Sequence, residues 1–368
     1  MTVFSKILLF SAIICSLTSS AFERGRKIDV NGREITIGND RLSITVLPER
    51  AGRISSIFLK EGKSELLDPS KVSAVMETPL FSYSSDNAKG IYELFWKKKL
   101  NGTVGVDCTV ADGKIIANGK YYGNVEVDLL REISLVPDAL ALEVKATFTN
   151  ITSEESELTP WIHIIGMPES TALIPQAPGP VNREGFGRLG KSPVPSLFTF
   201  GKHNNYLPPG TNWIAVKYTS KNLVWILRLP EGTLDKGGVF YTYGNGKGLQ
   251  TSEVIWPRSI VKPQGKVVIT YSIEIFPEMD NLNAVCGNTA VSFALKDGKL
   301  ALKFSASRKE NARKAVLICK DKAGNESQYE FNIPALAAGK GAQVTLPADA
   351  MPYTAKIIID GKEYTVFF

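Results

Sequence analysis

Apolar and polar residues alternate at every second position through long stretches of this chain, and this pattern constrains its fold most. The alternation is clearest over residues 41–48 (RLSITVLP), 139–148 (ALALEVKATF) and 266–276 (KVVITYSIEIF). Such a period is typical of β-strands with one buried and one exposed face, and no long stretch shows a helical period. The pairs that favour tight turns between strands are Asn31-Gly32, Asp112-Gly113, Asn118-Gly119, Asn245-Gly246, Asp297-Gly298 and Asp360-Gly361. The sequence therefore predicts an all-β sandwich or barrel.

The first residues of the chain have the composition of a secretory signal peptide. Lys6 precedes an apolar run over residues 7–15, and small residues ending at Ala21 follow it. These three parts predict a signal peptide over residues 1–21. The apolar run is shorter than the ~20 residues of a transmembrane helix. We therefore expect a periplasmic or secreted protein without a membrane span.

Charge and composition narrow the function classes. Of the 368 residues, 43% are hydrophobic and 22% charged, as in globular proteins, and the net charge is +6. The positive charges are scattered, whereas nucleic-acid binding needs a concentrated basic face. The chain has two histidines, and its cysteines lack the short, regular spacing of zinc ligands, so the sequence does not indicate a zinc site. We expect no nucleic-acid partner, no metal and no cofactor.

The alternation of apolar and polar residues changes twice along the chain. Residues 165–212 are rich in proline and glycine and poor in alternation, as in a long functional loop. Near residue 280 one series of strands closes, and a second series follows. We expect a large domain over 22–280 and a small immunoglobulin-like or fibronectin-like sandwich over 281–368. After signal removal, either Cys286 and Cys319 pair or Cys108, Cys286 and Cys319 are all free thiols.

Three stretches, in order, resemble the galactose mutarotase-like (aldose 1-epimerase-like) supersandwich superfamily. Residues 38–60 contain a strand that ends at a proline, a glycine turn and a second strand that begins with Arg53. Residues 147–166 (TFTNITSEESELTPWIHIIG) contain a Thr-Asn pair, a polar turn and a strand with His163. Residues 248–276 contain a strand with Glu253 and then a Pro-Gly turn. The resemblance implies a divergent member, with a large galactose mutarotase-like β-supersandwich before the small sandwich.

This resemblance also implies acid/base chemistry on a sugar. Glu253 would take the proton of the anomeric hydroxyl, and His163 would protonate the ring oxygen. Alternation places Trp161 on the same strand face as His163. The family carries a further histidine upstream, which this chain lacks, and His203 in the irregular loop is a substitute. The substrate contacts are assigned to Arg53, Trp96, Trp161 and His203.

Each of these residues also has a plain structural explanation. His163 could be a packed ring at a strand end, and Glu253 an ordinary exposed strand residue. The tryptophans could fill the core, and Arg53 could satisfy loop carbonyls. Three functions stay open, all with a sugar or glycan partner: an epimerase-like enzyme, a non-catalytic glycan-binding module, and a relative of polysaccharide lyases or glycosidases. The last would need a second carboxylate across the cleft.

Overall fold

The computed structural model describes residues 27–30, 34–48, 52–67, 74–78, 106–121, 126–165, 170–178, 194–199, 205–244, 250–348 and 350–368. Within these ranges the chain is almost entirely β, with the 3₁₀ turn η2 (Thr219–Lys221) between two strands and no α-helix. Among them no helix has the length and apolarity needed to cross a membrane. The expected signal peptide, Trp96 and His203 lie outside the described residues.

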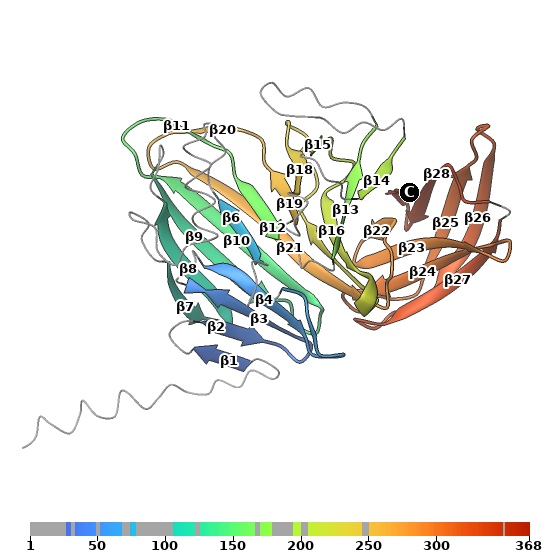
Figure 1. Ribbon diagram of the computed structural model, residues 1–368, viewed down its shortest axis with the longest axis horizontal. Helices are drawn as coiled ribbons and strands as arrows, with labels where there is room; N and C mark the ends of the chain where they lie inside the picture. Colours follow the sequence, from blue (N-terminus) through green and yellow to red (C-terminus); the bar gives the residue numbers. More distant parts are fainter. Residues whose placement is uncertain are drawn as a thin grey trace, which may run out of the picture.

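Two large antiparallel sheets form the first part of the structure (Figure 1). Sheet A has the order β1-β2-β3-β4-β6-β12-β19-β18-β15, with β5 beside β4. Its strands are β1 (Lys27–Val30), β2 (Ile35–Gly38), β3 (Leu42–Leu47), β4 (Arg53–Leu59), β5 (Ser64–Glu65), β6 (Ala74–Thr78), β12 (Trp161–Ile165), β15 (Asn205–Leu207), β18 (Val239–Gly244) and β19 (Gln250–Ile255).

Sheet B has the order β14-β13-β16-β17-β21-β10-β9-β8-β7. Its strands are β7 (Asp107–Ala111), β8 (Lys114–Tyr121), β9 (Val127–Leu135), β10 (Ala141–Asn150), β13 (Thr171–Gln176), β14 (Ser196–Thr199), β16 (Trp213–Tyr218), β17 (Leu223–Arg228) and β21 (Lys266–Pro277). A separate small ribbon pairs β11 (Ser156–Leu158) with β20 (Ser259–Val261).

The C-terminal part is a second, smaller sandwich of two four-stranded sheets, drawn in orange and red in Figure 1. One sheet contains β22 (Ala284–Cys286), β23 (Thr289–Lys296), β24 (Lys299–Ala306) and β27 (Gly341–Pro347). The other contains β25 (Arg313–Lys320), β26 (Glu326–Ile333), β28 (Thr354–Ile359) and β29 (Lys362–Val366). Sheet B ends at Pro277 and this sandwich begins at Ala284, close to the expected boundary at residue 280.

The alternating runs form strands as predicted. In β3, Leu42, Ile44 and Val46 are fully buried in the core between the two large sheets. β10 and β21 contribute alternate residues to the same core. The all-β prediction is therefore confirmed, and its physical basis in these alternating strands is the burial of every second side chain.

Asx-Gly pairs mark turns in some places and not in others. At Asp112, Asp297 and Asp360 the backbone has positive φ, as does the glycine that follows each, which is the geometry of tight hairpin turns. The prediction at Asn118-Gly119 is wrong, because both residues lie inside β8. A Cβ at Gly119 would lie 2.8 Å from the Val106 side chain, so close packing explains this glycine. The pairs at 31–32 and 245–246 lie outside the described residues.

A buried arginine links the two large sheets at the turn before β4. Arg131, on the core face of β9, is 1% exposed. Its guanidinium donates to the carbonyl of Gly52 and, over 3.3 Å, to the Tyr271 hydroxyl. Gly52 has φ +65°, and its N–H bonds to the Leu47 carbonyl, which closes the turn. Arg131 thus stabilises the turn from which β4 begins.

The small sandwich packs against the face of sheet B that points away from the main core. The contact is a separate apolar cluster in which strands β13, β16, β17 and β21 meet β22, β23 and the C-terminus. Its buried members are Leu173, Trp213, Ala215, Val224, Ile226, Phe276, Met279, Leu282, Val285, Ala290 and Phe367. This part of sheet B therefore has both faces buried, so the two parts of the chain are joined by a hydrophobic interface.

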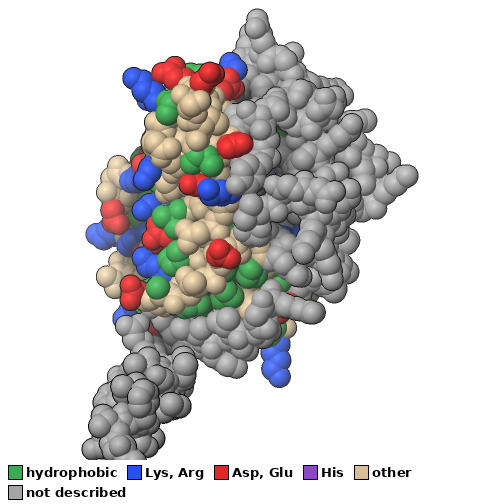
Figure 2. All heavy atoms as spheres, turned by 90° about the vertical axis from the view of Figure 1, so that its left-hand side faces the viewer, with side chains coloured by type: hydrophobic (Ala, Val, Ile, Leu, Met, Phe, Trp, Pro, Cys, Tyr) green, Lys and Arg blue, Asp and Glu red, His purple; other side chains and the backbone are tan. Residues whose placement is uncertain are grey.

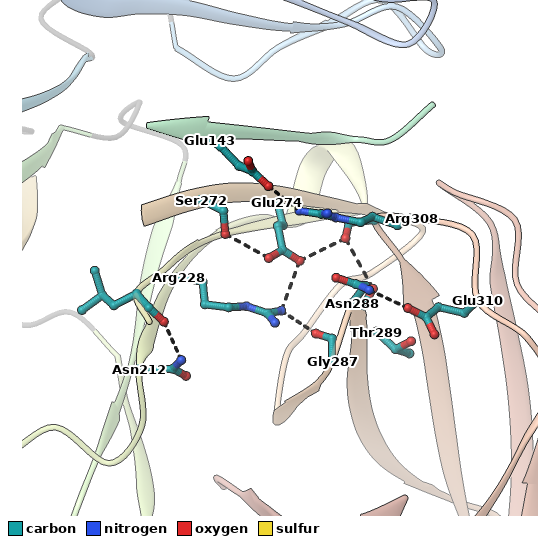
Figure 3. Close-up of polar contacts among 12 residues, drawn as sticks. Glu143, Asn212, Arg228, Ser272, Glu274, Gly287, Asn288, Thr289, Arg308 and Glu310 are labelled. Atoms are coloured by element: carbon teal, nitrogen blue, oxygen red, sulfur yellow. Dashed lines mark hydrogen bonds and ion pairs between the residues drawn. The ribbon is translucent and has the colours of Figure 1, made fainter. Parts of the chain in front are cut away.

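Polar residues continue this interface where the apolar cluster ends (Figure 3). Glu274 of β21 is 2% exposed, and its carboxylate lies 3.1 Å from Nη2 of Arg228. The Ser272 and Ser307 hydroxyls also donate to it, over 3.1 and 3.0 Å. Arg228 donates in addition to the Gly287 carbonyl. Ser307 and Gly287 come from the small sandwich, so the buried charge of Glu274 is compensated from both sides of the interface.

The described charged side chains of one flank are interspersed by sign. Figure 2, which faces the left side of Figure 1, shows Lys and Arg next to Asp and Glu over the described surface.

The three cysteines of the described chain are free thiols. The expected pairing of Cys286 with Cys319 is therefore not formed, and the alternative of free thiols holds. Burial raises the pKa of the Cys286 thiol to about 12 and the pKa of the Cys108 thiol to about 11. Such thiols are protonated at neutral pH and react slowly, because the thiolate is the nucleophile.

Phe367 should contribute strongly to stability, because its ring lies in the interface between the two parts. It is 1% exposed, and its ring centroid lies 6.0 Å from that of Trp213. We expect Phe367→Ala to lower the free energy of unfolding by about 3–5 kcal/mol in urea titrations. The matched control is Tyr353→Ala, because Tyr353 is 39% exposed; its effect should be much smaller. Equal losses for the two variants would contradict this account of the interface.

Candidate functional site

The pairing of β12 with β19 brings His163 and Glu253 together. In this antiparallel pair His163 lies directly opposite Glu253, and Ile162 lies opposite Val254. Ile162 and Val254 belong to the core between the sheets. Since side chains alternate along a strand, His163 and Glu253 both lie on the other face of sheet A. Two segments separated by about ninety residues of sequence thus place an imidazole and a carboxylate side by side.

The two side chains are close and almost fully buried. Nδ1 of His163 lies 3.6 Å from Oε2 of Glu253, which is an ion-pair distance rather than a direct hydrogen bond. Their exposed fractions are 5% and 3%. Thr251, two residues away on β19, donates its hydroxyl to Oε1 of Glu253. Oε2 accepts no hydrogen bond within the described part of the chain.

Trp161 covers the imidazole. Its ring centroid lies 4.1 Å from that of His163, with an interplanar angle of 34°. The two residues are two positions apart on β12, so they share one face, as the sequence pattern predicts. The contact places an apolar ring beside the polar pair. Aromatic rings of this kind present a flat apolar surface together with one polar N–H group.

Strand register places two more residues in the same row across sheet A. Tyr241 of β18 lies opposite Glu253. On the other side, Met76 of β6 lies opposite His163, and the neighbouring Val75 lies opposite Ile54. Arg53 precedes Ile54 and so falls at the level of Met76.

Arg53 is fully buried, and Ile54 next to it faces the core. Arg53 therefore lies on the face that carries His163. Neighbouring strands are ~4.8 Å apart, so the Cα atoms of Arg53 and His163 are about 10 Å apart. The structure thus brings four of the expected site residues to one face, namely Arg53, Trp161, His163 and Glu253. Trp96 and His203 lie outside the described residues, so their roles stay predictions.

Tyr241 and Thr251 were not expected from the sequence. Alternation could place Thr251 on the same face as Glu253, but that pattern also fits a surface threonine. Tyr241 became a neighbour of Glu253 only through the pairing of β18 with β19, which no local pattern reveals. Both residues lie beside the carboxylate, one along its strand and one across the sheet.

A buried imidazole beside a carboxylate can hold, donate or accept a proton, which is the requirement of general acid/base catalysis. Glu253 has one oxygen fixed by Thr251 and one directed at the imidazole. Within the described ranges, His, Cys, Asp and Glu form no group of three or more that could hold a metal ion.

No family model matches the chain, and no curated protein matches its sequence. Solved structures that resemble it include a candidate aldose 1-epimerase from Escherichia coli K12, with 12% identity, 68% of this chain and 99% of that chain covered, and a TM-score of 0.49. A galactose mutarotase-like protein from Lactobacillus casei has 11% identity, 66% and 99% coverage, and a TM-score of 0.47. A TPR-domain containing protein from Parabacteroides distasonis has 11% identity, 65% and 46% coverage, and a TM-score of 0.45, so this chain spans under half of it.

A double-mutant cycle should show that His163 and Glu253 are energetically coupled. Because both side chains are buried and in contact, we expect His163→Leu and Glu253→Gln to be non-additive by about 0.5–3 kcal/mol in urea unfolding. The control pair is Lys356 and Glu363, also on neighbouring strands at 2.8 Å but 39% and 54% exposed. Water screens that pair, so its coupling should be smaller. A larger coupling in the control pair would contradict the proposed contact.

Proposed function

We propose that the protein binds a sugar on the face of sheet A that carries His163 and Glu253, and that this pair performs acid/base chemistry at the anomeric centre. The proposal rests on one observation. A buried carboxylate oxygen of Glu253 accepts no hydrogen bond within the described chain and lies 3.6 Å from the His163 imidazole. A buried acceptor without a donor costs free energy, and a sugar hydroxyl supplies the missing donor.

The reaction that fits this pair is mutarotation. Glu253 takes the proton from the hydroxyl on C1 while protonated His163 gives a proton to the ring oxygen. The bond between C1 and the ring oxygen breaks, and C1 becomes the carbonyl of the open chain. Rotation about the bond to C1 and reversal of both proton transfers close the ring on the other face. The two proton transfers balance, so the cycle needs no co-reactant.

Trp161 fits the same ligand. A pyranose ring has apolar patches of C–H groups next to its hydroxyls, and an aromatic ring can stack on such a patch. The Trp161 ring lies against the imidazole, so a sugar stacked on it would have its hydroxyls near the polar pair. Arg53 lies on the same face of sheet A, which supports the proposal that it contributes to the same sugar site.

A second candidate is a non-catalytic glycan-binding protein. The short distance between His163 and Glu253 favours this candidate. One carboxylate oxygen of Glu253 accepts a hydrogen bond from Thr251, and the other faces the His163 imidazole. Such a cross-strand pair can hold the shape of a binding site without turning over a ligand. Turnover measurements separate the two candidates.

Polarimetry on freshly dissolved α-glucose and α-galactose tests the enzymatic proposal. We expect the protein to accelerate the approach to anomeric equilibrium, and Glu253→Gln to lower the rate by at least about 100-fold, because the amide cannot act as the base. Glu157→Gln is the matched control. Glu157 lies on β11 and pairs with Arg258, away from His163 and Glu253 on sheet A. The Glu157→Gln variant should therefore have the rate of the unmodified protein.

Sugar binding without acceleration, measured by calorimetry with a panel of mono- and oligosaccharides, would establish the second candidate instead. If neither acceleration nor binding is found, both candidates are wrong.

We also propose that the protein is exported, on the strength of the composition of residues 1–21. Cleavage after Ala21 removes the charged, apolar and small-residue parts together. Mass spectrometry of the protein made in a bacterial host with an intact export system should find Phe22 at the N-terminus. A mature chain that retains its first twenty-one residues would contradict export by this route.

A further inference from the structure

A row of polar residues crosses sheet B on the face that points away from the main core. Register sets Lys114 opposite Ser134, Ser134 opposite Glu143, Glu143 opposite Ser272, and Ser272 opposite Arg228. Each has core-facing neighbours along its own strand, such as Ile115 and Ile133. We call these five residues the polar row. It spans five neighbouring strands, which is about 19 Å at ~4.8 Å per strand.

The polar row forms the floor of a cavity between sheet B and the small sandwich. The cavity has a volume of about 540 Å³, and all five residues of the row line it. Asn288 and Arg308 of the small sandwich form its opposite wall. Figure 3 shows Arg308 reaching from that side toward Glu143 of β10, with a nitrogen–oxygen distance of 3.2 Å. A volume of this size is within the range of small-molecule sites.

The cavity has an excess of positive charge. Four cationic side chains and three carboxylates line it. Each carboxylate already has a cationic partner: Glu274 pairs with Arg228, Glu143 with Arg308, and Glu132 with Lys145. Lys114 forms no ion pair with any described residue, so its ammonium group is the uncompensated charge. One anion would balance it.

Two further donors line the cavity with Lys114: Ser134 on the next strand, and Arg308, which contacts Glu143 one strand further on. Arg308 uses only Nη2 in its contact with Glu143, and its Nη1 has no hydrogen bond to a described residue, while the side chain is 32% exposed. The Ser134 hydroxyl, between Lys114 and Glu143 in the polar row, likewise bonds to no described residue. An ammonium, a guanidinium nitrogen and a hydroxyl thus line the same cavity over three neighbouring strands.

We propose that Lys114, Ser134 and Arg308 form a binding site for a single oxyanion, held above Ser134 at the junction of the two sandwiches. Arginine suits the planar or tetrahedral oxygens of carboxylate, sulfate and phosphate, and lysine adds a point charge. The oxyanion is either a free inorganic anion or the carboxylate of an acidic sugar. The site lies on sheet B, on the side of the sandwich opposite to His163, so it is independent of the proposed sugar chemistry.

Isothermal titration calorimetry on the full chain tests the site at constant ionic strength. The titrants are sulfate, phosphate and glucuronate, with methyl glucoside as the neutral comparison. We expect one oxyanion to bind per chain. Any heat from methyl glucoside should disappear in His163→Leu, because a neutral sugar should bind only at the site on sheet A. Arg308→Gln should weaken oxyanion binding about tenfold, since it removes a charged hydrogen-bond donor. Lys114→Gln should weaken oxyanion binding a few-fold, since Lys114 is exposed and water screens its attraction to the anion.

Lys120→Gln is the matched control, because Lys120 lies on the same strand, outside the cavity, and pairs with Asp128. It should bind as the unmodified protein does. Lys114 is exposed, so Lys114→Gln decides the test even if Arg308→Gln folds poorly. Tighter binding of glucuronate than of sulfate and phosphate assigns the site to an acidic sugar, and the reverse assigns it to a free anion.

The proposal is overturned if none of the three anions binds, or if Lys114→Gln and Arg308→Gln bind them as tightly as Lys120→Gln does. These outcomes leave the sugar proposal untouched, because mutarotation is tested with Glu253→Gln and not with these variants. Loss of mutarotation would in turn leave oxyanion binding unchanged.

Discussion

The register between neighbouring strands is the constraint on which both proposed sites depend. A slip of one residue turns every side chain of a strand to the opposite face. In β12 such a slip would move His163 into the core between the sheets and bring Ile162 or Ile164 to the face that Glu253 occupies. Both isoleucines are buried in that core, so the hydrophobic gain of their burial holds the register. The contact of His163 with Glu253 follows from the packing of residues that take no part in it.

Sheet B shows what happens when both faces of a strand are covered. In β17, Leu223, Trp225 and Leu227 belong to the main core, while Val224 and Ile226 belong to the interface with the small sandwich. On the face of β17 that meets the small sandwich, the apolar residues are followed by Arg228, which pairs with the buried Glu274. The hydrophobic contact joins the two parts, and the polar contacts of Arg228 and Glu274 continue the interface. The cavity above the polar row lies at this transition.

The two proposed sites therefore use opposite outer faces of one sandwich. On sheet A the face is defined by Trp161, His163 and Glu253, and the chemistry that we propose for it is proton transfer beside an aromatic ring. On sheet B the face is defined by Lys114, Ser134 and Arg308, and its chemistry is charge compensation. The main core separates them. A substitution at one site should leave the other intact, because residues without shared contacts act additively.

The sequence by itself determined the strands, because alternation depends only on residues two positions apart. It determined that the chain is all-β, that Asp112, Asp297 and Asp360 stand in tight turns, and that Trp161 and His163 share a face. It also pointed to His163, Glu253 and Arg53, through stretches that resemble a known superfamily.

Only the tertiary structure decided which strands are neighbours, because pairing depends on contacts between distant segments. It placed Tyr241 beside Glu253 and set Lys114 and Arg228 in one row. It kept Asn118-Gly119 inside a strand, because Val106 packs against that glycine, and it left Cys286 and Cys319 as separate buried thiols. Local pattern sets the face on which a side chain lies, and long-range register sets its neighbours.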